Sequence, residues 1–270
     1  MRESCDTLIL SDLHLGSEAS RAADAVQLLQ TVSFNRLILL GDIFSDLNFA
    51  RLTRDHWDFL SEIRRLSNPR RRKQVIWVEG NHDLGLSNLM SHLTGISVYQ
   101  RYVWQFGGKR HIAIHGHQFD RFVSKNYLLS RIGVRIYEQL QHWDTQSKKF
   151  TNTLDRLSTR WLRLTEKVAE GALAYAEAGH ADRIFCGHTH LPTMRSRNGI
   201  DYFNTGCWVE QIPTYITIDE TGVHLREYRD VSRTRHRHPR EERRELPSEA
   251  PCLFEHAGLP AVAAYESLRC

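Results

Sequence analysis

The stretch TLILSDLH, residues 7–14, places an apolar run directly before an aspartate and a histidine. Four more runs follow the same plan: RLILLGD at 36–42, QVIWVEGN at 74–81, HIAIHG at 111–116 and RIFCGHTH at 183–190. Their length and β-branched content predict buried strands. Segments of helical composition or period lie between the early runs, at 19–32 and 53–66. This alternation of strands and helices predicts an α/β sandwich.

The later part of the chain predicts further strands at 200–206, 214–219 and 223–228. In open α/β sheets, ligands gather outside the carboxyl ends of the strands. The polar residues that directly follow the apolar runs are therefore the candidates for a functional site.

Residues 121–178 have a different character, with no proline and only two glycines. One helical face is apolar at steps of three or four residues: Leu154, Leu157, Trp161, Leu164 and Val168. A second face is basic at the same steps: Arg156, Arg160, Arg163 and Lys167. We expect a helical cap inserted into the core. An ordinary helix packed on the core, with a solvated basic side, fits the same pattern.

The end of the chain, 231–270, loses these patterns, and SRTRHRHPREERREL at 232–246 is dense in charge without an apolar period. We expect a charged, mobile and solvated tail there. The core is then expected at 1–120 and 179–230. Such a tail could instead contact nucleic acid or acidic lipid, but no nucleic-acid partner is expected.

The composition limits the class of protein without choosing a substrate. The chain has 270 residues, of which 41% are hydrophobic, so it can form one large domain or one domain with an insert. Its net charge of +4 permits anionic substrates or membranes without requiring them. The charged start at 1–6 has no apolar signal segment, and the five cysteines show no metal-type spacing. We therefore expect a cytoplasmic protein with reduced thiols and no membrane span.

Seven side chains that suit metal binding stand where the apolar runs end. They are Asp12, His14, Asp42, Asn81, His115, His188 and His190. Carboxylate, imidazole and amide ligands suit Mn²⁺, Fe or Zn²⁺. Seven ligands are enough for two divalent cations that share a bridge, and a set with two carboxylates stays net positive and attracts phosphate. Glycines directly before three of these residues let the backbone turn sharply: before Asp42, Asn81 and His188.

The stretch IHGHQFD at 114–120 offers two histidines, of which one follows the run directly. His115 stands at the exit of the apolar residues IAI, as the other candidate ligands do. His117 lies one residue beyond the turn residue Gly116. We therefore expect His115 to be the metal ligand and His117 to be a nearby polar group, behind the ligands or at the mouth of the substrate site.

The ordered blocks D-x-H, G-D, G-N-H-D, H and G-H-x-H resemble those of the calcineurin-like metallophosphoesterases over about residues 6–220. This resemblance implies a two-sheet αββα sandwich with a dinuclear metal centre. It assigns the first metal to Asp12, His14, Asp42 and His190. It assigns the second to Asp42, Asn81, His115 and His188, with Asp42 as the bridge. Mn²⁺ is the expected metal by analogy, with Fe or Zn²⁺ as the other options.

Within that family, the insert and the block FNTGCWVE at 203–210 look like the UDP-2,3-diacylglucosamine pyrophosphohydrolases of lipid A synthesis. Two positions depart from that branch. Those enzymes typically have arginine in place of His82 and aspartate in place of His117. The resemblance therefore supports the scaffold and the cap more than the substrate, and a paralogue with different chemistry at the leaving group is expected.

The implied reaction is hydrolysis of a phosphoester or pyrophosphate bond. His82 is expected to protonate the leaving oxygen, and Asp83 to orient its ring; the alternative for His82 is a polar residue in a tight turn. We expect the cap to select the substrate through Trp161, Arg156 and Arg160. If it reads an acylated substrate, it would also contact lipid, with the protein peripheral on the inner face of the membrane.

Three functions compete at this stage. The first is hydrolysis of a lipid-linked pyrophosphate resembling UDP-diacylglucosamine. The second is a soluble phosphodiesterase or phosphatase that acts on a nucleotide or another small phosphoester. The third is a non-catalytic scaffold or nucleic-acid binder that keeps the fold, and the complete ligand set argues against it.

Overall fold

The computed structural model describes residues 4–46, 48–85, 91–92, 95–120 and 148–229. The first sheet has the strand order β11 (Gly222–Glu227), β10 (Thr214–Asp219), β1 (Thr7–Leu10), β2 (Arg36–Leu40), β3 (Gln74–Val78), β4 (Val98–Tyr99). Strands β1 to β4 pair in parallel, and β10 joins β1 antiparallel. Parallel strands need crossover connections, which here are α1 (Ala22–Thr31) between β1 and β2 and α2 (Arg54–Leu66) between β2 and β3.

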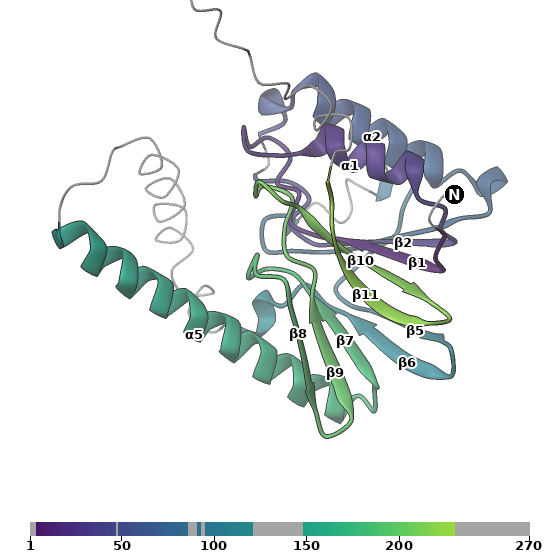
Figure 1. Ribbon diagram of the computed structural model, residues 1–270. Coiled ribbons are helices and arrows are strands. Elements are labelled where there is room, and N and C mark those ends of the chain that lie inside the picture. The colour runs from purple at the N-terminus through teal and green to yellow at the C-terminus, as the bar shows by residue number, and fades with distance from the viewer. Residues whose placement is uncertain (1–3, 47, 86–90, 93–94, 121–147, 230–270) are drawn as a thin grey trace, which may run out of the picture. The chain divides into compact units, whose positions relative to one another are not determined.

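These two helices pack on one face of the first sheet (Figure 1). Successive strand residues point to opposite faces, so Leu8 and Leu10 contact the helical layer while Ile9 enters the layer between the sheets. Phe59 of α2 is fully buried against this face. A capping box starts α2, in which the backbone N–H of Thr53 donates to Nδ1 of His56 at 3.0 Å.

The second sheet has the strand order β5 (Tyr102–Phe106), β6 (Lys109–Ala113), β7 (Arg183–Cys186), β9 (Ile200–Asn204), β8 (Thr193–Arg197). Its three central strands, β6, β7 and β9, are parallel. The two sheets share one apolar layer, in which Phe185 stacks on Phe203 with ring centroids 5.1 Å apart. Short 3-10 helices complete the connections: η1 (Phe49–Arg51), η2 (Pro69–Arg71) and η3 (His117–Phe119).

Helix α5 (Lys148–Ala178) supplies the outer layer of the second sheet. Small and apolar residues of its C-terminal part, Ala169, Ala172, Leu173 and Ala176, are buried against β6, β7 and β9. This part of the expected 121–178 insert therefore belongs to the sandwich, as an ordinary core-packed helix. Further towards its N-terminus, Trp161 leaves the core and is 44% exposed.

The predicted αββα sandwich is confirmed: helices, two sheets and a further helix form its layers. The expected helices and strands that fall within the described residues occur within a few residues of their predicted bounds, whereas β4, β5 and β8 were not expected. Among the described helices, none combines the length and apolar character that a membrane crossing requires. The expected tail at 231–270 and the first part of the insert, at 121–147, lie outside the described residues.

Candidate metal centre

Seven predicted ligands follow strands at the same edge of the sandwich. Asp12 follows β1, Asp42 follows β2 and Asn81 follows β3, all parallel neighbours in the first sheet. From the second sheet, His115 follows β6, while His188 and His190 follow its parallel neighbour β7. Because carboxyl ends of parallel strands share an edge, residues far apart in sequence converge there.

The backbone at this edge adopts a conformation that side chains rarely permit. Eight described non-glycine residues have positive φ, and five of them are predicted ligands: Asp12, His14, Asp42, His188 and His190. Each such conformation costs about 1–3 kcal/mol and persists where the surrounding structure enforces it. Strain concentrated on one set of polar residues is the pattern of a functional site.

Three glycines bring the loops into close contact with the ligands. A Cβ on Gly41 would lie 2.3 Å from Nδ1 of His115, and one on Gly187 would lie 2.4 Å from Oδ2 of Asp12. Gly80 would place its Cβ 2.2 Å from the backbone nitrogen of Asp42. Gly41 also has a φ of +80°. The expected turning freedom therefore applies to Gly41, whereas Gly80 and Gly187 are required by close approach.

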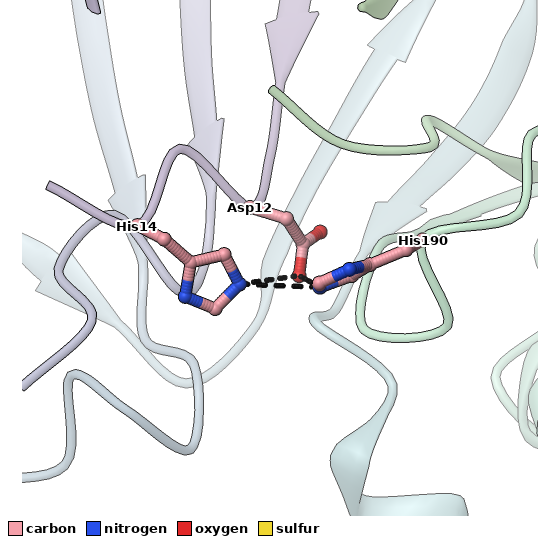
Figure 2. A group of neighbouring side chains, drawn as sticks. All are labelled: Asp12, His14 and His190. Carbon is pink, nitrogen blue, oxygen red and sulfur yellow. Dashed lines mark hydrogen bonds and ion pairs between the residues drawn. The ribbon is translucent and has the colours of Figure 1, made fainter. Parts of the chain in front are cut away.

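A first group consists of Asp12, His14 and His190, whose side chains converge in Figure 2. Nε2 of His190 lies 3.2 Å from Oδ1 of Asp12 and 3.1 Å from Nε2 of His14. The ligand atoms of all three residues lie within 4.8 Å of one another. This spacing suits one shared cation, and the three residues are among the four predicted for the first metal.

A second group consists of Asp42, His115 and His188, which are all buried. Nδ1 of His115 lies 2.9 Å from the carbonyl oxygen of Leu40, so this nitrogen donates to the backbone. The other nitrogen, Nε2, then faces Oδ2 of Asp42 at 3.2 Å. Asp42 also forms a group with His14 and His82, so it links both sides of the centre as a bridging ligand would.

Charge explains why these carboxylates stay ionised. Burial alone would raise the pKa of Asp12, but the hydrogen bond and charge of His190 outweigh it and lower the pKa. Burial likewise opposes ionisation of Asp42, yet His115 brings its pKa well below the ordinary value. In turn, burial would lower the pKa of His115, and the charge of Asp42 raises it to about 9. The two carboxylates thus require positive partners.

The donor set fits divalent cations. The buried side-chain oxygen of Asn81 makes no hydrogen bond within the described part of the chain. A buried polar atom without a partner costs about 1–3 kcal/mol, and a cation beside Asp42 would satisfy this oxygen. The combination of two carboxylates, four imidazoles and one amide oxygen suits Mn²⁺, Fe or Zn²⁺. The groups are consistent with divalent metal ions and leave the element open.

The two residues expected to act on the leaving group have separate surroundings. Nδ1 of His82 lies 2.7 Å from the carbonyl oxygen of Ser45, and Nε2 lies 3.9 Å from Oδ2 of Asp42. Asp83 instead accepts hydrogen bonds from the backbone N–H groups of Ile43 and Phe44, at 3.1 and 3.0 Å. Ser45 thus contacts the ring of His82, and Asp83 holds the loop after Asp42; the expected action of Asp83 on the ring stays a prediction.

His117 lies beside the second group without joining it. Its ring centroid is 5.5 Å from that of His115 and 6.3 Å from that of His188. Burial, together with the charge of His115, lowers the pKa of His117 to about 3. His117 is thus a neutral imidazole next to the second group, and its expected role at the substrate site stays a prediction.

Of the three residues through which the cap was expected to select the substrate, only Trp161 has a described side chain, and it lies near the centre. The ring of Trp161 lies 6.5 Å from that of His190, edge to face. The predicted substrate contacts Arg156 and Arg160 lie in the part of α5 whose side chains are outside the described structure. Their assigned role stays a prediction.

Sequence reasoning missed two supporting residues. The buried Asn204 donates from Nδ2 to the carbonyl oxygen of Gly187 at 2.6 Å and to Oγ1 of Thr189 at 3.1 Å, which holds the G-H-x-H loop. Asp120 lies with Oδ2 3.6 Å from Nε2 of His188. Asp120 belongs to none of the motifs in the sequence. Asn204 lies in the block FNTGCWVE, which indicates a family resemblance but no role for this asparagine.

A model of the calcineurin-like phosphoesterase superfamily domain matches residues 6–221 of the chain. The protein belongs to this superfamily, and a metal-dependent phosphoesterase is the class that its fold and site define. A comparison with curated protein sequences gives no match. The matched domain includes all seven predicted ligands.

Solved structures with detectable similarity are distant. An archaeal phosphodiesterase is 14% identical, with 82% of this chain and 97% of that chain covered and a TM-score of 0.45. Wild-type Vps29 of Entamoeba histolytica in complex with Zn²⁺ is 13% identical, with the same coverage and a TM-score of 0.43. A conserved uncharacterised protein from Streptococcus pneumoniae TIGR4, described as a predicted phosphoesterase, is 14% identical over 83% of this chain and 97% of that chain, with a TM-score of 0.38.

Replacement of Gly187 by alanine should weaken metal binding, because its Cβ would displace the Asp12 carboxylate. We expect Gly187→Ala to lower the affinity for Mn²⁺ at least ~10-fold in isothermal titration calorimetry, corresponding to about 1.4 kcal/mol. Gly199→Ala is the control, since its φ of +78° adds backbone strain that Gly187 lacks, while no atom lies within 4 Å of its Cβ. Equal affinities in both variants and the wild type would contradict the close-approach argument.

Alanine variants of the two histidines on either side of Gly116 should differ in the number of metal ions that they bind. His115→Ala removes a ligand and should leave about one Mn²⁺ per chain, whereas His117→Ala should keep two. Elemental analysis after equilibration with Mn²⁺ and removal of unbound metal measures both variants. Loss of metal in the His117 variant with retention in the His115 variant would reverse the assignment.

Proposed function

We propose that the protein hydrolyses a small phosphodiester or phosphomonoester, such as a nucleotide derivative, with two divalent cations, most simply Mn²⁺. The observation that carries this proposal is the convergence of six predicted ligands, two buried carboxylates and four histidines, in groups that share His14 and Asp42. The proposed sets are Asp12, His14, Asp42 and His190 for one cation and Asp42, Asn81, His115 and His188 for the other. We place the activity in the cytoplasm.

When bound, the cations would supply an acidified water and positive charge for the phosphoryl oxygens. The protein's own residues fix where this happens. The carboxylates of Asp12 and Asp42 would hold the cations, and the strained loops limit the movement of these two side chains. Preorganised charge of this kind is suited to phosphoryl transfer, in which positioning and charge stabilisation provide most of the catalysis.

His82 is the proposed donor of a proton to the leaving oxygen. Its side chain is 22% exposed at the centre, and contact of Nδ1 with Ser45 directs Nε2 to the side of Asp42. A protonated imidazole held in this way can donate from Nε2 while Nδ1 remains bonded to the backbone. Asp83 acts indirectly, through the backbone of the loop that carries Asp42.

The intact ligand set and the strain at five ligands support an enzyme over a scaffold. A protein that kept only the fold would have no use for an unfavourable backbone at these positions. The alternative of a non-catalytic binder remains a testable outcome.

A second candidate, a lipid-linked pyrophosphate resembling UDP-diacylglucosamine, is favoured by one observation. Large apolar side chains are exposed on α5, at Trp161 and Leu162, and after β7, at Leu191 and Met194, and the Trp161 ring lies 6.5 Å from that of His190. They could accept acyl chains and let α5 touch a membrane surface. The departures at His82 and His117 from the enzymes of that branch favour the small-substrate proposal.

A hydrolysis panel with Mn²⁺ tests the proposed function. We expect turnover of bis-p-nitrophenyl phosphate, p-nitrophenyl phosphate or nucleotides, and a loss of at least ~10³-fold in Asp42→Ala because the bridge is removed, about 4 kcal/mol. Hydrolysis of none of these substrates would overturn the proposal. A clear preference for UDP-2,3-diacylglucosamine, lost at least ~10-fold more strongly in Trp161→Ala than the small-substrate rate, would select the second candidate.

The role of His82 predicts a dependence on the leaving group. A p-nitrophenolate leaves without a proton, whereas an alkoxide needs one, so His82→Ala should reduce kcat for an alkyl ester at least ~10-fold more than for a p-nitrophenyl ester. His117→Ala is the matched control, because it removes a histidine that lies beside His115 and His188. Equal losses for both esters would assign His82 to another role.

A further inference from the structure

We propose that Asp120 is a positioning residue of the metal centre, which holds Nε2–H of the His188 ring and so presents Nδ1 of that ring to the cation. This inference rests on the proposed metal centre and adds a residue that the family's ordered blocks do not contain. With this tautomer, the two histidines of the second group would offer opposite ring nitrogens to a cation.

The distance between the two side chains is the first step. Oδ2 of Asp120 lies 3.6 Å from Nε2 of His188, with side chains 2% and 7% exposed. This separation is a close contact of the two polar atoms, slightly longer than a hydrogen bond. In this burial, a carboxylate is the strongest available acceptor for a ring N–H. The proton of a neutral His188 ring therefore belongs on Nε2, and Nδ1 carries the lone pair.

The ring of His115 is held in the same way, but through the other nitrogen. Its Nδ1 contacts the carbonyl oxygen of Leu40 at 2.9 Å, which leaves Nε2 facing Asp42. Metal-bound histidines usually donate their second N–H to a carboxylate or a carbonyl, and this partner fixes both the tautomer and the ring orientation. Leu40 provides the carbonyl for one histidine, and Asp120 provides the carboxylate for the other.

The main chain of His188 is fixed separately, so Asp120 acts on the ring. The backbone N–H of His188 donates to the carboxylate of Asp12, at 3.1 Å to Oδ2 and 3.3 Å to Oδ1. This bond ties the loop to the first metal group. The backbone bond does not prevent the imidazole from rotating about its side-chain bonds. The contact with Asp120 restricts that rotation.

The position of Asp120 depends on α5. Asp120 ends the η3 turn, where its N–H donates to the carbonyl oxygen of His117 at 3.1 Å. Phe119 in this turn packs on Gly171, whose added Cβ would lie 2.9 Å from Cβ of Phe119. The Phe119 ring also meets Tyr175 of α5, with centroids 5.7 Å apart. The helix thus fixes the turn that carries the carboxylate.

The charge balance gives Asp120 a second effect. Two divalent cations bring four positive charges, and the seven predicted ligands contain only two carboxylates. Asp120 adds a third carboxylate, 3% exposed, on the side of the second metal. A negative charge behind the ring also makes the opposite nitrogen a stronger ligand.

Metal affinity and ring tautomer test the inference without any assay of activity. We expect Asp120→Ala to weaken one of two Mn²⁺ sites ~10–100-fold in calorimetry and to leave the other within ~3-fold. Asp120→Asn, which keeps the shape and an acceptor oxygen without the charge, should fall between Ala and the wild type. Asp201→Asn is the control, because Asp201 belongs to β9 and its Oδ2 forms an ion pair with Nε of Arg183 at 3.7 Å. Wild-type affinity of both sites in Asp120→Ala would overturn the proposal.

The tautomer is measured in the wild type by ¹⁵N NMR of the histidine rings, in metal-free and Zn²⁺-loaded protein at a pH where His188 is neutral. We expect the His188 proton on Nε2 in both states, with a larger Nδ1 tautomer population in Asp120→Ala. A proton on Nδ1, or direct binding of Zn²⁺ through Nε2, would overturn the inference. If the wild type bound no metal, the proposed function would fail, while the metal-free spectrum would still decide the tautomer.

Discussion

The site depends on two carboxylates that the fold removes from water. Asp12 is fully buried and Asp42 is 2% exposed, and an unpaired charge at such positions would be strongly destabilising. Their partners come from distant parts of the chain: His190 for Asp12, and His115 with the backbone N–H of His82 for Asp42. Neither sheet alone can satisfy these charges. The need to pair them therefore couples the two halves of the sandwich and creates a place for cations.

The same constraint explains the unusual backbone around the centre. Ligands that must reach a common point from separate strand ends cannot all follow extended geometry, and five of them adopt positive φ. Glycines at 41, 80 and 187 remove the Cβ atoms that would block this convergence. Backbone bonds then connect the loops: Asp12 N–H donates to the carbonyl oxygen of Gly41 at 3.0 Å, and Gly187 N–H to that of His115 at 3.0 Å. A rigid, strained frame of this kind favours one ligand geometry over alternatives.

Helix α5 connects the outer layer of the fold to the centre. Its C-terminal part packs on the second sheet and on Phe119, whereas Trp161 extends to the neighbourhood of His190. Arg195 of β8 forms an ion pair with Glu166 of the same helix. One element therefore contributes to stability, to the placement of Asp120 and to the surface that a substrate would meet. A substitution in α5 can affect all three, which is why control variants matter for any assignment of substrate contacts.

The sequence by itself determined the order of strands and helices, because apolar runs of strand length alternate with helical periods. It also determined the seven candidate ligands, since polar residues that directly follow parallel strands must share an edge. The assignment of these ligands to a first and a second metal came from resemblance to the superfamily, because the spacing of residues along the sequence does not contain it. Only the tertiary structure decided that Asp83 supports a backbone loop while Ser45 contacts His82. It likewise decided that part of the expected cap is a core layer and that Asp120 reaches His188. Such contacts depend on side-chain direction and on the packing of elements far apart in the chain, and neither leaves a periodic signal in the sequence.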